Sequence, residues 1–108
     1  MTLNDPVYIE AAQSLARRTV AAAETTEDRI RFLFHTTLIR NPKPLEIKRI
    51  TQLVEEASAA FSTDVDAAKQ MATDPIGDRP EGADMVELAA WTVVGNVMLN
   101  LDELLMKR

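Results

Sequence analysis

The chain has 108 residues, one histidine, no cysteine and a formal net charge of −5 at neutral pH. Without thiols it cannot form disulfides, thiolate zinc sites, iron–sulfur clusters or the covalent attachment of c-type haem. An acidic chain also lacks the basic surface that nucleic-acid binding requires, so we expect no nucleic-acid partner. The length predicts a single domain over residues 1–108.

The charge is divided unevenly along the chain. Residues 1–54 contain eight basic and six acidic side chains, a net charge of +2. Residues 55–108 contain four basic and eleven acidic side chains, a net charge of −7. The acidic half predicts either a solvated surface that keeps the protein soluble or a docking face for a basic partner.

The composition favours an all-α fold. Three glycines and five prolines supply few turns for an all-β protein, and helix-forming residues dominate. The first helix is expected from Pro6 to about Ala23, with Asp5 as its N-cap. Its apolar face is weak and rich in alanine, and Gln13 and Arg17 lie off that face. The residues expected on it are Tyr8, Ala11, Ala12, Leu15, Thr19 and Ala22.

The second and third helices are separated by a proline motif. Thr25, with Asp28 three residues later, resembles a capping box and predicts the second helix start. Asn41-Pro42-Lys43-Pro44 ends this helix, since a residue before proline avoids the helical region. Pro44 then opens the third helix. Its apolar stripe is the clearest in the chain, and it consists of Ile47, Ile50, Leu53, Val54, Ala57 and Phe61.

A short fourth helix is expected from Thr63, which can cap it together with Asp66, to about Ala72. Residues 74–83 form the main loop, and a last helix follows from about Asp84 to Met106. Its uncharged run from Leu88 to Leu101 spans 14 residues, whereas a membrane span needs about 20. Asn96 and Asn100 within this run also favour a buried helix of a soluble protein, so we expect no membrane span.

The last helix is apolar on two faces, which predicts that it lies at the centre of the fold. The sequence therefore predicts an irregular all-α bundle of four long helices and one short helix, with the last helix central. Trp91 is expected to anchor the core, and Gly95 to let another helix approach closely.

Few residues are candidates for chemistry. His35 is interpreted as a partly exposed structural histidine, the alternatives being a non-covalent haem ligand or a general base. Asp102 and Glu103 are adjacent on a helix and point about 100° apart, so they cannot face each other across a substrate. One of them is expected to tie the last helix to a basic residue of the second helix, such as Arg40. We predict no catalytic, metal or cofactor-binding residues, and structural roles for Trp91, Asn100, Asp102, Arg40 and Pro44.

Five basic side chains fall within two neighbouring helices. They are Arg29, Arg31, Arg40, Lys48 and Arg49. Their spacing predicts either solvated helix faces or one cluster that binds an anion or an acidic protein. Helical spacing alone does not decide between the two interpretations.

Several stretches of the chain resemble one family. They are Leu3–Ala12, Arg29–Phe34, Arg40–Pro44 with Glu46, Ala89–Val94 and Leu99–Glu103. Together they resemble the C-terminal segment of the planctomycete cytochrome-associated proteins, the domain of unknown function 1553 family. One departure is Lys43, which replaces the threonine that caps the third helix in that family.

The resemblance implies a context and no catalytic residues. Family members are exported, multi-domain proteins with a c-type cytochrome module upstream, so it implies an extracytoplasmic location and a larger parent protein. We expect a non-catalytic structural or interaction module that docks onto other domains of its parent or self-associates. The alternatives are a redox accessory that contacts haem through His35 and a methionine, or a hydrolase fragment that uses Asp102 and Glu103.

Overall fold

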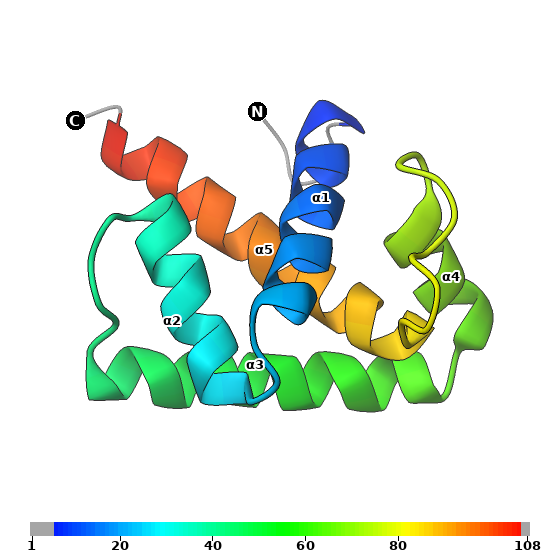
Figure 1. Ribbon diagram of the computed structural model, residues 1–108, viewed down its shortest axis with the longest axis horizontal. Helices are drawn as coiled ribbons and strands as arrows, with labels where there is room; N and C mark the ends of the chain where they lie inside the picture. Colours follow the sequence, from blue (N-terminus) through cyan, green and yellow to red (C-terminus); the bar gives the residue numbers. More distant parts are fainter. Residues whose placement is uncertain (1–5, 107–108) are drawn as a thin grey trace.

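The computed structural model describes residues 6–106, and the side chains of residues 9–100. Within this part the chain forms five α-helices and no strand (Figure 1). The helices are α1 (Pro6–Ala22), α2 (Thr26–Thr37), α3 (Pro44–Ser62), α4 (Val65–Thr73) and α5 (Met85–Met106). The predicted all-α bundle with one short helix is confirmed.

α5 lies at the centre of the bundle, as predicted. It contacts each of the other four helices, and its most extensive contact is with α1. α3 runs along one side of the molecule beneath α1, α2 and α5 (Figure 1). Trp91 is only 2% exposed and belongs to the main core. The buried members of this core are Leu15, Ala16, Ile30, Leu33, Phe34, Val54, Trp91, Val94 and Met98.

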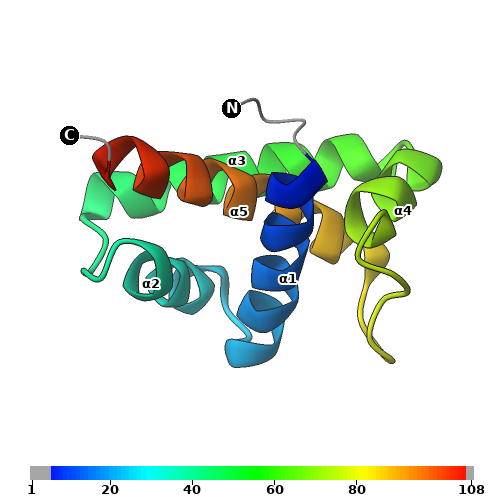
Figure 2. The ribbon, with the colours of Figure 1, turned by 90° about the horizontal axis from the view of Figure 1, so that it is seen from above.

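The crossing of α1 and α5 depends on a glycine. Gly95 is buried, and a Cβ atom placed on it would lie 3.2 Å from the backbone oxygen of Ala12. Figure 2 shows α1 crossing α5 at a steep angle. The predicted role of Gly95 is therefore confirmed, because a side chain here would meet the backbone of α1.

The helix starts follow the predicted capping only in part. The Asp28 N–H donates to Thr25 Oγ1 at 3.2 Å, which confirms Thr25 as the N-cap of α2. Asp64, and not Thr63, caps α4, because its carboxylate accepts the Ala67 N–H at 3.1 Å. Thr63 ends α3 instead, where its hydroxyl donates to the Ala60 carbonyl. The predicted cap of α1, Asp5, lies outside the described residues.

α2 ends earlier than the proline motif predicts. Its last residue is Thr37, and the Leu38 N–H closes the helix on the Phe34 carbonyl. Ile39 then adopts a left-handed backbone with φ of 56°, which turns the chain out of the helix. Arg40 consequently lies in the loop between α2 and α3 and not on a helix.

The buried face of α1 matches the predicted one only in part, since Ala12, Leu15 and Thr19 are buried as expected. Ala11 and Ala22 are exposed, whereas Gln13 is completely buried. The Gln13 Nε2 donates to the carbonyls of Met71 and Asp74, both at 2.8 Å, and its Oε1 accepts the Ile76 N–H. The side chain is buried because these backbone groups at the end of α4 need partners inside the fold.

Arg17, one turn after Gln13, completes this connection. Its guanidinium donates to the carbonyls of Ala72 and Gly77, at 3.2 Å and 2.6 Å. Two side chains of α1 thus hold the C-terminus of α4 and the loop that follows it. This contact positions the second core cluster, whose buried members are Ala68, Ala72, Leu88 and Ala89.

Candidate functional site

The α2–α3 loop is closed by a bidentate ion pair. Arg40 donates from both terminal nitrogens to the two carboxylate oxygens of Glu46, at 2.8 Å and 2.7 Å. Its guanidinium also lies 5.2 Å from the centre of the Phe34 ring. The hydrogen bond from Arg40 is the main reason that the pKa of Glu46 falls to about 2. Arg40 therefore organises this loop.

Glu46 also starts α3. Its Oε1 accepts the Lys43 N–H at 2.8 Å, which is the half of a capping box that the third helical residue supplies. The other half needs an acceptor on the N-cap side chain, which lysine lacks. Pro44 occupies the first position of α3, as predicted. The predicted connection from Asp102 or Glu103 to Arg40 involves side chains outside the described residues. Within those residues, the carboxylate that binds Arg40 is Glu46.

His35 is exposed in the last turn of α2, next to the same loop. Its Nε2 pairs with the side-chain oxygen of Asn41, which links α2 to the turn. Within the described residues, no three histidine, aspartate or glutamate side chains lie close enough together to hold a metal ion. This contact with Asn41 agrees with the interpretation of His35 as a structural histidine.

The basic residues of α2 and its flanks do not form one cluster. Arg31 pairs with Glu27 and Asp28 on its own helix, and Arg40 pairs with Glu46. Arg29 points the other way, into the interior, where it is 8% exposed and pairs with Glu87 of α5 at 3.2 Å. The interpretation as a single anion site is therefore wrong for these three arginines, because each has its own carboxylate.

Arg29 is a residue whose role the sequence did not reveal. It donates to the carbonyls of Ala23 and Val20 at the end of α1, and its guanidinium lies 5.8 Å from the centre of the Trp91 ring. In the sequence, the only indication that Arg29 is buried was its position next to Ile30 on the predicted second helix. Asn100, for which a structural role was predicted, is exposed on α5.

One cleft of about 550 Å³ is acidic. We call it the acidic cleft. Four carboxylates come from three different parts of the fold: Glu24 follows α1, Glu55 lies on α3, and Asp84 and Glu87 lie at the start of α5. Its remaining lining residues are Thr26, Arg29, Val54, Ser58, Ser62, Val86 and Trp91. With four carboxylates and one arginine, the cleft attracts cations.

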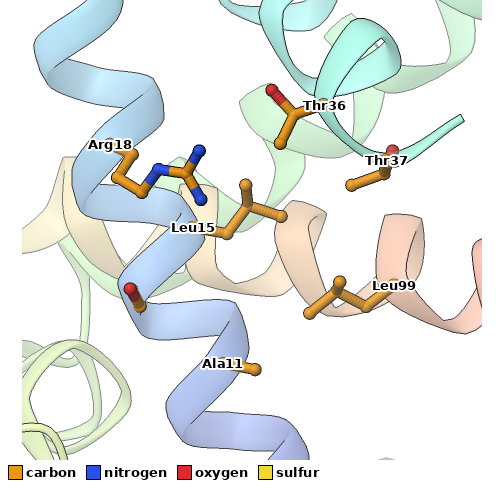
Figure 3. A pocket seen from close by; sticks show the side chains of 7 residues that line it. Ala11, Leu15, Arg18, Thr36, Thr37 and Leu99 are labelled. Atoms are coloured by element: carbon orange, nitrogen blue, oxygen red, sulfur yellow. The ribbon is translucent and has the colours of Figure 1, made fainter. Parts of the chain in front are cut away.

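A second cleft, of about 310 Å³, has the opposite charge. We call it the Arg18 cleft (Figure 3). It lies between α1, α2 and the C-terminal half of α5. Its described lining residues are Ala11, Ser14, Leu15, Arg18, Thr36, Thr37 and Leu99, and Arg18 is the one charged residue among them.

Comparison of the chain with protein-family models, with curated proteins and with solved structures finds no match in any of the three. The resemblance to the planctomycete cytochrome-associated family therefore stays a prediction. Within the described residues, none of the helices combines the length and apolar character that a membrane crossing requires.

Proposed function

We propose that this chain is a non-catalytic helical module that docks onto a basic protein segment through its acidic cleft. The observation that carries the proposal is the convergence of Glu24, Glu55, Asp84 and Glu87 on one cleft from α3, from the start of α5 and from the loop after α1. Carboxylates gathered around a concave, partly apolar surface focus their field and attract a cationic partner.

The floor of the cleft suits the side chains of lysine and arginine. Val86 is half-buried and offers aliphatic surface, whereas Val54 and Trp91 are buried and add only small accessible patches. The methylene stems of basic side chains pack on such surfaces while their charged ends remain near water and carboxylates. A basic segment with apolar spacing would therefore use both the floor and the rim.

The internal cation of the cleft is largely neutralised. Arg29 is paired with Glu87 and donates to two backbone carbonyls, so it adds little repulsion toward an incoming base. Glu24, Glu55 and Asp84 have no ion-pair partner within residues 9–100. These three carboxylates are the ones that we assign to partner binding.

The family resemblance suggests where the basic segment would come from. If the chain is the C-terminal part of a larger exported protein, we propose that the segment lies in another domain of that parent or in a second copy. A haem-contacting role has less support, since the Nε2 of His35 would first have to leave Asn41. No arrangement of the described residues favours a carboxylate-dependent hydrolase.

The proposal is tested with a short synthetic peptide in which lysine or arginine alternates with leucine. We expect binding that weakens steeply as salt rises, because the attraction is between partly exposed charges. Glu55→Gln combined with Asp84→Asn should weaken the affinity several-fold, measured by fluorescence anisotropy. Binding without salt dependence, or no binding at low salt, would reject the acidic cleft as a docking site.

A matched control separates the cleft from the general acidity of the second half. Glu56→Gln combined with Asp78→Asn removes the same two charges from exposed positions outside the cleft. We expect this variant to bind nearly as well as the wild-type chain. If both double variants lose the same affinity, the effect comes from net charge and the proposal is wrong.

A further inference from the structure

The Arg18 cleft combines one cation with an apolar wall. In Figure 3 the guanidinium of Arg18 extends from α1 toward α2, while Thr36 lies on the opposite wall. Leu15 of α1 and Leu99 of α5 supply the apolar part of the lining. The cleft thus offers a charged end and an apolar end within a single volume of about 310 Å³.

Arg18 differs from the paired arginines of this protein. Arg29, Arg31 and Arg40 each have a carboxylate within 3.2 Å, and no such partner for Arg18 exists among residues 9–100. Its described aromatic neighbour is Phe32, whose ring centre lies 5.9 Å from the guanidinium carbon. All five of its N–H donors are therefore suited to an external acceptor.

Two hydroxyl groups add to the donor set. Thr37 Oγ1 already donates to the Leu33 carbonyl of its own helix at 2.7 Å. Ser14 and Thr36 have no such bond to another described residue. Their hydroxyls are further hydrogen-bond donors in the lining of the cleft, and together with Arg18 they favour a ligand with an oxyanion.

We propose that the Arg18 cleft binds a short-chain monocarboxylic acid. The carboxylate would accept two parallel hydrogen bonds from Arg18, and the hydrocarbon chain would lie against Leu15 and Leu99. The volume is near the lower limit for small-molecule sites, which restricts the ligand to a small acid. A single cation neutralises a monoanion, whereas a phosphate dianion would keep excess charge beside apolar side chains.

The test uses hexanoate as the probe and nitrogen–proton NMR spectra of the whole chain as the readout. We expect shifts in the amides of Ser14, Leu15, Thr36 and Leu99, and a Kd on the order of 1 mM. Hexanol lacks the charge, and acetate lacks the hydrocarbon chain, so each should bind clearly more weakly. Inorganic phosphate should also bind more weakly than hexanoate.

Variants locate the charge that matters. Arg18→Gln should weaken hexanoate binding about tenfold, since it removes a hydrogen bond to a charged group. Arg49→Gln removes the same charge from an exposed position on α3 outside both clefts, and it should leave the affinity unchanged. The melting temperature of each variant checks that the fold is intact.

Several outcomes would overturn the inference. They are hexanol binding as tightly as hexanoate, tighter binding of phosphate, an equal loss in both arginine variants, or no shift of any lining amide at saturating probe. Because the acidic cleft lies on other residues, none of these outcomes affects the proposed docking function.

Discussion

Arg40 and Glu46 form two parallel hydrogen bonds, and this ion pair connects the turn after α2 to the first turn of α3. Glu46 also accepts a hydrogen bond from the Lys43 N–H, so the same carboxylate closes the loop and caps the start of α3. The pair is partly exposed, with 41% and 31% of the two side chains accessible. Solvent screening therefore limits its contribution, although its geometry is favourable.

We predict that Glu46→Gln lowers the free energy of unfolding at pH 7 by about 1 kcal/mol. The folded pKa of Glu46 is about 2, below its ordinary value of 4.5. Its stabilisation is therefore complete above pH 4.5 and is lost as the pH falls toward 2. Urea unfolding followed by circular dichroism should show the gap between variant and wild type closing over this range. A gap that stays constant with pH would contradict the assigned role.

Ile39 carries the one positive φ found at a non-glycine residue of the described chain, and its side chain is 80% exposed. A β-branched residue in the left-handed region is strained, and an exposed isoleucine gains little burial in return. We predict that Ile39→Gly raises the free energy of unfolding by about 1 kcal/mol. Thermal unfolding measures the change. Ile39→Val keeps the branched Cβ and should show no gain, and a loss of stability in Ile39→Gly would contradict the prediction.

Gln13 satisfies three backbone groups with one buried side chain. Gln13→Met keeps the volume but leaves those groups without a partner, at a cost of roughly 2–3 kcal/mol. Hydrogen exchange gives a specific readout, because the Ile76 amide should exchange faster while amides of α2 change only with global stability. Ser14→Ala, at an exposed position beside it, serves as the control. Unchanged exchange at Ile76 would show that Gln13 does not hold this loop.

Gly95 is expected to tolerate no large side chain. Gly95→Leu would place its Cβ 3.2 Å from the Ala12 oxygen and the rest of the side chain in the α1–α5 contact, at a cost of about 2 kcal/mol or more. Asn100→Leu, at an exposed position of the same helix, should change stability by less than about 0.5 kcal/mol. Chemical denaturation compares the two. Equal effects would mean that the close crossing of α1 and α5 is not needed.

Local sequence patterns accounted for much of the fold. The Thr25 cap, Pro44 at the start of α3, the buried Trp91 and the glycine at a helix crossing each depend on residues close together in the chain or on helical periodicity. The errors occurred where partners are distant. The burial of Gln13, for example, depends on backbone groups about 60 residues away.

By itself, the sequence determined that this protein is an all-α bundle built around its last helix, because capping and apolar periodicity are local properties. Only the tertiary structure decided which charges meet. In the folded chain, Arg29 points inward and forms an ion pair with Glu87, and Arg40 forms one with Glu46. The tertiary structure also gathered carboxylates from separate segments into the acidic cleft. The reason is physical, since a charge interacts over a few ångströms of space and helix packing sets those distances.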